Sequence, residues 1–168
     1  MLILYIALFK NDYYLVIAMS DIHDLNSSII KAFRGKGYKA TPQRLAISRF
    51  ALCCRDHPTA KMIYSQIKKE YPTVSLATVY ATLLILKEVG LLQEMNLPQS
   101  KARFDPDMQP HVHLVCLQCD SIIDWRHPLV SKVIAEVAAD AKFSVTGQVL
   151  EITGLCSRCK GKTDMVEK

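Results

Sequence analysis

The sequence predicts an α+β protein with two parts, a helical N-terminal half and a smaller mixed C-terminal half. Three observations support this division. Apolar residues recur at helical spacing through the first half, a polar segment bounded by prolines follows, and four cysteines in two Cys-x-x-Cys pairs lie beyond it. With 168 residues, 50% of them hydrophobic, the chain can form one domain or two small ones.

Residues 1–18 form an apolar N-terminal extension. The run has no basic start and is interrupted at Lys10, Asn11 and Asp12, so it is too short to cross a bilayer and does not resemble a secretory signal. It is either an extra strand or helix, or the product of an upstream start with Met19 as the natural first residue, and we favour the second interpretation. We therefore expect a cytoplasmic protein with no membrane partner, in which paired cysteines more often bind metal than each other.

Capping hydroxyls, glycines and prolines divide the next part of the chain into helices. An amphipathic segment comes first, and each later helix follows a Ser or Thr that can cap it. The expected helices are residues 25–33, a helix that begins at Pro42 after Thr41, a helix that follows Thr59 and ends before Pro72, and residues 76–89 between Ser75 and Gly90.

Two short extended segments follow the last helix, residues 91–97 and 101–104, and Pro98-Gln99-Ser100 separates them. This spacing predicts a hairpin. Helices followed by a hairpin make a winged helix-turn-helix, in which the last helix enters the DNA major groove. We therefore expect residues 19–104 to be a winged-helix DNA-binding domain, and the net charge of +5 agrees with a nucleic-acid partner.

The polar segment 105–110 is the expected hinge, and residues 111–168 are the expected dimerisation and metal-binding domain. The hydrophobic period there predicts strands at 113–115 and 122–125, a helix at 129–141 and a strand at 143–152. A small α+β domain with an edge strand is a natural dimerisation unit, because two such sheets can pair across a two-fold axis. A homodimer is therefore predicted.

Four cysteines of this second domain predict a zinc site. They stand in the pattern Cys-x2-Cys-x36-Cys-x2-Cys, at Cys116, Cys119, Cys156 and Cys159. Four thiolates complete the tetrahedral coordination of Zn²⁺, so the site is structural and not catalytic. The alternative is two redox-active pairs or two disulfides. Cys53 and Cys54 are expected to pack as small apolar residues, with a thiol switch as their alternative role.

A second metal site is predicted beside the first cysteine pair. His111 and His113 alternate on an extended segment, so both imidazoles face one side. Asp105 before them and Asp124 on the next strand can supply oxygen ligands, and His57 lies at a helix break in the first half. Mixed nitrogen and carboxylate ligands suit Fe(II) and Mn(II), although Zn(II) would also bind.

From about Lys36 to Lys160 the chain resembles the ferric uptake regulator family, and its ligand pattern is most similar to the peroxide-responsive branch. The resembling residues are His57-Pro58-Thr59-Ala60, Ser75-Leu76-Ala77-Thr78-Val79-Tyr80, Arg103-Phe104-Asp105, His111-x-His113-x-x-Cys116-x-x-Cys119, Asp124 and Cys156-x-x-Cys159. The resemblance implies a regulatory metal held by His57, Asp105, His111, His113 and Asp124.

The resemblance also implies a mechanism, in which bound Fe(II) reacts with hydrogen peroxide and a ligating histidine is oxidised. His57 and His111 are the expected targets of this oxidation. An aspartate at position 124 is typical of the peroxide sensors, whereas iron sensors commonly carry a glutamate there. Iron-sensing relatives often have a further histidine where this chain has Gly147-Gln148, so a third metal site is not expected.

Basic residues around the first helices, such as Arg34 and Arg44, are expected to contact phosphates. In the last helix Thr78 and Tyr80 point away from the apolar stripe and could contact phosphates or thymine methyl groups. Packing in the core is the alternative role of Tyr80. By resemblance Tyr80 contacts bases and Lys39 reaches a narrow minor groove, which implies an operator of A/T-rich inverted repeats.

The residues thus predict a dimeric, metal-dependent DNA-binding repressor that is not an enzyme, and the resemblance implies that it senses hydrogen peroxide. The alternative within the same family is a regulator that responds to iron, manganese or zinc availability. A zinc hydrolase is a rival of another class, but the sequence has no HExxH or comparable signature. A zinc-ribbon interaction module without DNA binding leaves the helical half unexplained.

Overall fold

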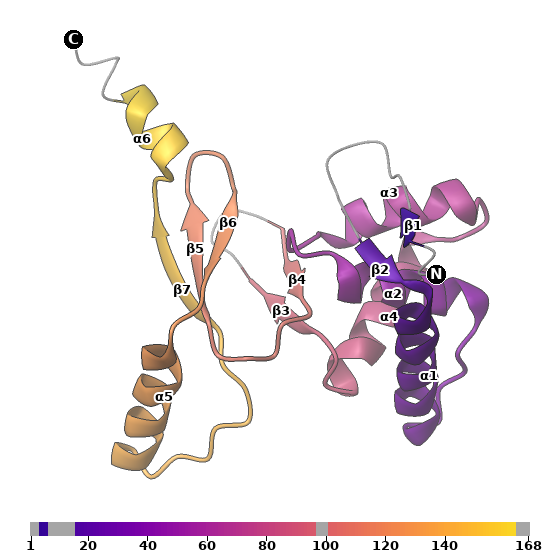
Figure 1. Cartoon of the computed structure of the whole chain (residues 1–168), viewed down its shortest axis with the longest axis horizontal. Coiled ribbons are helices and arrows are strands. Elements are labelled where there is room, and N and C mark those ends of the chain that lie inside the picture. The colour runs from indigo at the N-terminus through magenta and orange to yellow at the C-terminus, as the bar shows by residue number, and fades with distance from the viewer. Residues whose placement is uncertain (1–3, 7–15, 97–100, 164–168) are drawn as a thin grey trace. The chain divides into compact units, whose positions relative to one another are not determined.

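The computed structural model describes residues 4–6, 16–96 and 101–163 of the chain. The chain divides into two compact units, Met1–Met108 and Gln109–Lys168 (Figure 1). No helix in the described ranges is both long and apolar enough to cross a membrane.

The first unit begins with a short antiparallel hairpin and continues with helices. Part of the N-terminal extension therefore forms strands, and Met19 as the natural start remains a prediction. The elements in chain order are β1 (Leu4–Ile6), β2 (Val16–Ala18), α1 (Met19–Gly35), α2 (Pro42–Cys53), α3 (Ala60–Glu70), α4 (Leu76–Glu88), β3 (Gln93–Met95) and β4 (Arg103–Asp105).

The local signals that start α2, α3 and α4 act as predicted, whereas α1 begins at Met19, six residues before its predicted start at residue 25. Thr41, Thr59 and Ser75 each accept a hydrogen bond from the backbone N–H three residues later, at 3.4, 3.2 and 3.0 Å. Each bond satisfies an N–H that the first helical turn leaves without a partner. Gly90 follows α4 with a φ of 71°, a left-handed conformation that glycine adopts without strain.

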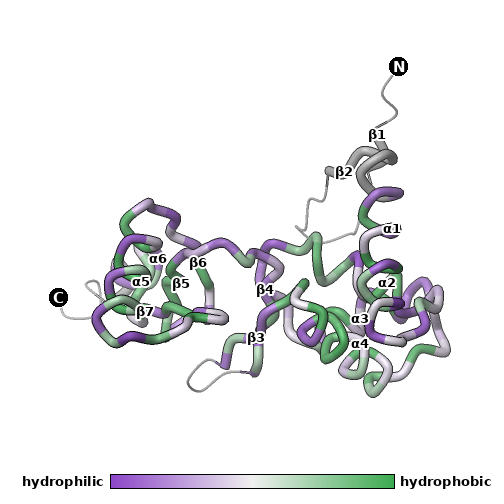
Figure 2. Tube along the Cα trace, turned by 90° about the horizontal axis from the view of Figure 1, so that it is seen from below, coloured by the Kyte–Doolittle hydropathy of each residue, from purple (hydrophilic) through white to green (hydrophobic). Residues whose placement is uncertain are grey.

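The four helices bury one hydrophobic core. Figure 2 shows hydrophobic stretches in α2 and α4, and the core draws on every helix of the unit as well as on β4. The opposite side of α4 remains exposed, since Tyr80 and Leu84 keep 47% and 60% of their surface. The core therefore fixes α4 and leaves one face of it available for a partner. The largest core residues are Ile29, Phe33, Ile47, Ile63, Leu83 and Leu86.

The β3–β4 hairpin is the wing of a winged helix-turn-helix. Its strands are antiparallel and shorter than predicted, with Gln93 opposite Asp105 and Met95 opposite Arg103. Asp105 was expected in the hinge, but it is the last residue of β4 because it pairs with Gln93. The predicted turn at 98–100 lies outside the described residues.

The second unit is a three-stranded sheet with two helices. Its elements are β5 (Val112–Cys116), β6 (Ile122–Trp125), α5 (Pro128–Asp140), β7 (Leu150–Gly154) and α6 (Ser157–Thr163). The strand order is β6-β5-β7, in which β5 pairs antiparallel with β6 and parallel with β7. The first two strands and α5 were predicted closely, whereas α6 was not predicted.

The predicted strand at 143–152 is wrong over residues 143–149. Only Leu150–Gly154 pairs with β5, and the preceding residues form no regular element. Phe143, Val145 and Val149 keep 69%, 41% and 47% of their surface exposed. An alternating apolar pattern becomes a strand only where its backbone N–H and C=O groups find a neighbouring strand.

Apolar side chains remain exposed on several elements of this second unit. Leu129, Val133 and Val137 of α5 lie one turn apart and are 53%, 51% and 61% exposed. Ile123 on β6 and Ile152 on β7 are also more than half exposed, at 53% and 59%. Exposed apolar surface of this extent is typical of an association surface.

Candidate metal centres and nucleic-acid surface

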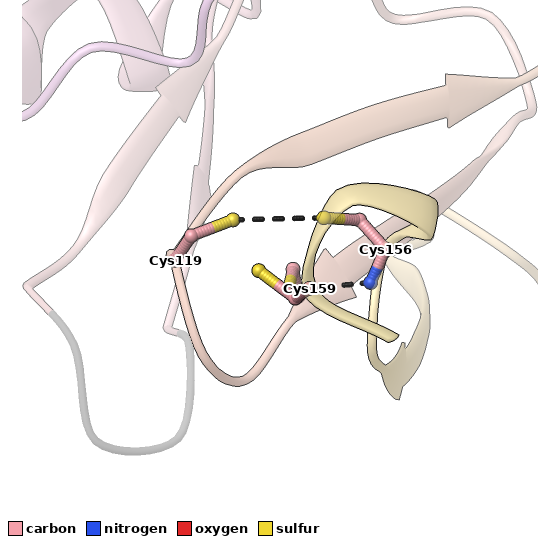
Figure 3. Close-up of side chains that lie close together, drawn as sticks. Cys119, Cys156 and Cys159 are labelled. Atoms are coloured by element: carbon pink, nitrogen blue, oxygen red, sulfur yellow. Dashed lines mark hydrogen bonds between the residues drawn. The ribbon is translucent and has the colours of Figure 1, made fainter. Parts of the chain in front are cut away.

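The four predicted zinc ligands come together at one end of the second sheet. Cys116 ends β5, Cys119 lies in the turn after it, Cys156 directly precedes α6 and Cys159 lies in the first turn of that helix. One sulfur atom from each lies within 4.8 Å of the others. Cys119 Sγ and Cys156 Sγ are 3.8 Å apart and point toward one another (Figure 3).

This geometry fits Zn²⁺. Two sulfurs at a tetrahedral angle, each about 2.3 Å from zinc, lie about 3.8 Å apart. The Cys156 N–H donates to Cys116 Sγ at 3.3 Å, so the backbone already places donors toward sulfur. That bond lowers the pKa of Cys116 to about 6, whereas burial raises the pKa of Cys159 to about 12. A bound cation would lower the pKa of all four cysteines together, because it stabilises all four thiolates at once. The cysteine cluster is therefore a structural zinc site.

The first unit contributes an imidazole and a carboxylate that face each other. His57 and Asp105 are 3% and 2% exposed, and His57 Nε2 lies 3.8 Å from Asp105 Oδ1. His57 has a φ of 47°, which is a strained conformation for a residue other than glycine. The wing holds the loop in place, since the Arg103 guanidinium donates to the His57 carbonyl at 3.3 Å and the Phe104 N–H donates to the Pro58 carbonyl at 3.1 Å.

Gln93 orients the carboxylate of Asp105. Its side-chain amide donates to Asp105 Oδ2 at 2.7 Å and to the Asp107 carbonyl at 2.9 Å. The Asp107 N–H donates to Asp105 Oδ1 at 2.9 Å. Hydrogen bonds of this kind stabilise the ionised carboxylate and fix its direction. The sequence did not indicate Gln93, because its role depends on the register of the hairpin.

The second unit brings two imidazoles together on one face of its sheet. His111 Nε2 and His113 Nε2 are 2.9 Å apart, and the residues are 3% and 1% exposed. The Gln109 carbonyl lies 2.7 Å from His111 Nδ1, so this nitrogen carries the proton and donates. His111 Nε2 therefore has a lone pair directed away from the Gln109 carbonyl, which is the atom a metal requires.

Asp124 adds an oxygen to these nitrogens. It lies opposite His113 in the β5–β6 ladder, and its Oδ1 is 3.9 Å from His111 Nε2. The Arg126 guanidinium donates to the other oxygen, Oδ2, at 3.0 Å. Within this unit His111, His113 and Asp124 thus form a nitrogen and oxygen cluster, with each ligand atom within 4.8 Å of the others. Such a cluster fits a divalent metal of the Fe(II) or Mn(II) kind.

The adjacent thiols of the first unit lie at the end of α2. Cys54 is 6% exposed, Cys53 is partly buried, and desolvation raises the pKa of both thiols above the ordinary value. The reactive form of cysteine is the thiolate, which a raised pKa makes scarcer at neutral pH. The structure therefore favours packing over a thiol switch.

We expect Cys53 and Cys54 in the native, zinc-loaded protein to react with iodoacetamide more slowly than in the unfolded chain at pH 7.5. Because their pKa values are raised, the rate should rise only as the pH climbs above the range of a free cysteine. Peptide mass spectrometry would measure this modification. Alkylation of native Cys53 at the unfolded rate would refute the burial argument.

The predicted DNA-contacting residues lie on α4 and on the loop between α1 and α2. Tyr80 is 47% exposed, which excludes the alternative that it packs in the core. Thr78 is half-buried, and its hydroxyl lies 2.8 Å from the Ser75 hydroxyl at the start of the helix. Lys39 is exposed, and its carbonyl accepts a hydrogen bond from Arg44 at 2.9 Å. Both α4 and this loop thus present polar groups to solvent.

A winged helix, a thiolate zinc site and a buried set of histidine and aspartate ligands define the class of protein, a metal-dependent DNA-binding transcriptional regulator. Comparison with known proteins agrees with this class. The model of the ferric uptake regulator family matches residues 35–153, which is more than half of the chain. The protein belongs to the ferric uptake regulator family.

Individual relatives support the assignment. The peroxide-responsive repressor PerR of Staphylococcus aureus (strain USA300) is 35% identical over 140 residues, which cover 83% of this chain and 94% of that protein. The crystal structure of the Campylobacter jejuni peroxide stress regulator is 30% identical with a TM-score of 0.61, over 82% of this chain and 98% of that one. The Helicobacter pylori ferric uptake regulator shares the fold, with a TM-score of 0.71 at 18% identity over 83% and 93% of the two chains.

Family membership decides between the classes of function that the sequence left open. The protein is a transcriptional regulator and not an enzyme, so the zinc-hydrolase interpretation is wrong. Family membership likewise excludes a zinc-ribbon module that does not bind DNA.

Proposed function

We propose that this protein is a homodimeric repressor that releases its operator when hydrogen peroxide oxidises a histidine of its regulatory metal site. The observation that carries the proposal is the convergence of His111 Nε2, His113 Nε2 and Asp124 Oδ1 on one face of the second sheet. These are nitrogen and oxygen ligands, which suit Fe(II) and Mn(II), and they are distinct from the thiolates that suit zinc.

His57 and Asp105 complete the proposed ligand set of five residues. They lie on the DNA-binding unit, whereas His111, His113 and Asp124 lie on the other unit. A metal that binds all five favours the arrangement of the two units in which it is bound. Metal affinity and DNA affinity are then coupled, because both depend on that arrangement.

Bound Fe(II) would supply the redox catalysis that cleaves the O–O bond of hydrogen peroxide beside the ligands, with no net change in its own oxidation state. In the net reaction one peroxide oxygen is added to a ring carbon of His57 or His111, and the other leaves as water. The ring is oxidised by two electrons and the peroxide is reduced by two. An oxidised imidazole is a weaker ligand, so the DNA-competent arrangement loses its metal-dependent stabilisation.

We infer that α4 reads DNA from the major groove, with Tyr80 and Thr78 at its exposed N-terminal half and Lys39 in the adjacent minor groove. A dimer related by a two-fold axis requires an inverted-repeat operator, and Lys39 favours an A/T-rich one. The exposed apolar residues of α5, β6 and β7 support pairing of two copies of the second unit. The proposed location is the cytoplasm, where reduced cysteines persist.

DNA binding by protein loaded anaerobically with Fe(II) or with Mn(II) tests this proposal. An operator selected from a random duplex library would be titrated by fluorescence anisotropy before and after micromolar peroxide. We expect the Fe(II) form alone to lose binding, with one added oxygen atom on the peptide that contains His57 or His111. The Mn(II) form is the matched control.

Two other results have clear meanings. Unchanged binding with unmodified histidines in the Fe(II) form would leave a regulator that responds to metal availability. The same loss in a protein that carries Cys53→Ser and Cys54→Ala would show that these thiols take no part, whereas a loss that requires them would contradict the proposal.

A further inference from the structure

One carboxylate beside the regulatory ligands has no role in the mechanism above. Glu151 lies on β7, directly beside His113 of β5, and Asp124 of β6 lies beside His113 on the other side. Paired residues of neighbouring strands have their side chains on the same face of a sheet, and strands lie about 4.8 Å apart. Asp124, His113 and Glu151 therefore form one row across this face.

The carboxylate of Glu151 is partly withdrawn from solvent. Its Oε1 has less than 1 Å² of accessible surface and accepts no hydrogen bond from the described residues. Buried polar atoms in native proteins nearly always have a partner, and an unpaired carboxylate oxygen is among the most unfavourable exceptions. A carboxylate in this position requires a donor, and the nearest strand neighbour that can supply one is His113.

The orientation of the two imidazoles shows which nitrogen of His113 would donate to Glu151. His111 Nε2 and His113 Nε2 point toward each other, so the Nδ1 atom of each ring lies on the side away from the ligand cluster. For His111 that atom donates to the Gln109 carbonyl at 2.7 Å. Histidines that bind metals almost always donate their second ring N–H to a carboxylate or a carbonyl.

We propose that Glu151 is a positioning residue of the regulatory site, which accepts a hydrogen bond from His113 Nδ1–H. This bond fixes the tautomer of His113 that carries its lone pair on Nε2, and the negative charge raises the basicity of that nitrogen. The inference rests on the proposed function, because it assigns Glu151 to the same metal site. Glu151 acts through His113 and is not itself one of the five proposed ligands.

The position of Glu151 also connects the two metal sites of this unit. From Glu151 the chain follows β7 to its last residue, Gly154, and reaches the zinc ligand Cys156 two residues later. The Gly154 carbonyl accepts a hydrogen bond from Leu117 N–H at 2.8 Å. Zinc bound by the cysteines would add to the β5–β7 pairing that places Glu151 beside His113.

The test compares Glu151→Gln and Glu151→Ala with wild type in zinc-loaded full-length protein, with Glu136→Gln as the control. Glu136 is exposed on α5 of the same unit, so the control removes the same charge at a solvated position. Mn(II) affinity would be measured anaerobically by competition titration. We expect Glu151→Ala to weaken it about 10- to 100-fold and Glu151→Gln less, with zinc content and dimer mass unchanged.

A second measurement uses wild-type protein without Mn(II), so that it needs no variant. Long-range ¹H–¹⁵N correlation spectra distinguish the two neutral histidine tautomers, and we expect His113 to be protonated on Nδ1. Protonation on Nε2 instead, or a Glu151→Ala affinity equal to that of wild type, would overturn the inference. If wild type itself binds no Mn(II) or Fe(II), the proposed function fails, while the tautomer still decides the role of Glu151.

Discussion

The Cys156→Ser protein is expected to lose its zinc, to unfold residues 109–168 and to elute as a monomer. Cys156 supplies one of four sulfurs, and its N–H donates to the sulfur of Cys116. Few apolar side chains are buried among residues 109–163, chiefly Val112, Val115 and Val130. A core of this size depends on the metal, and structural zinc contributes about 10–16 kcal/mol of apparent binding free energy in small zinc domains.

Zinc content, thermal unfolding by circular dichroism and sedimentation measure the three parts of this result. Cys53→Ser is the matched control, since Cys53 lies in the other unit and outside the zinc cluster. The Cys53→Ser protein should retain its zinc, its melting temperature and the mass of a dimer. A Cys156→Ser protein that remained a folded dimer with an unchanged melting temperature would show that zinc does not hold this unit together.

The Asp124→Asn protein is expected to keep its fold and its zinc but to bind Mn(II) and Fe(II) much more weakly. The side chain of Asp124 is 14% exposed, and asparagine preserves its shape while removing the charge. Loss of a direct ligand should exceed the roughly 10- to 100-fold effect that is usual for a residue that only orients a ligand. We therefore expect more than about 100-fold loss of Mn(II) affinity.

This variant should also lose metal-dependent DNA binding, because the metal no longer favours one arrangement of the two units. Calorimetric titration with Mn(II) and operator anisotropy at fixed salt would measure both effects. Asp140→Asn, on an exposed position of α5, is the control. Wild-type Mn(II) affinity in Asp124→Asn would remove Asp124 from the proposed ligand set, and loss of zinc would indicate a folding defect.

Three helices of the first unit, α2, α3 and α4, could be predicted closely because their signals are local. Thr41, Thr59 and Ser75 satisfy backbone N–H groups only three residues away, and Gly90 ends α4 through its own backbone freedom. The cysteine spacing was informative for the same reason. Each Cys-x-x-Cys pair lies within one turn of backbone, and four thiols complete the tetrahedral coordination of one Zn²⁺.

Residues that depend on strand pairing could not be found in this way. Gln93 orients Asp105 only because the wing places them opposite each other, and Glu151 lies beside His113 only because β7 runs parallel to β5. The error at residues 143–149 has the same origin, since the apolar alternation gave no information on which backbone would pair with it. Register is set by contacts between distant segments, and a single sequence does not display those contacts.

The sequence by itself determined the starts of α2, α3 and α4, the four cysteines that form the zinc site and the kinds of side chain at the second site, because these depend on residues close together in the chain. The tertiary structure alone decided how they are used. It aligned Asp124, His113 and Glu151 in one row, placed Gln93 opposite Asp105 on the wing, and left residues 143–149 without a strand partner. These arrangements arise from packing and strand register, which act between segments that are far apart in the chain.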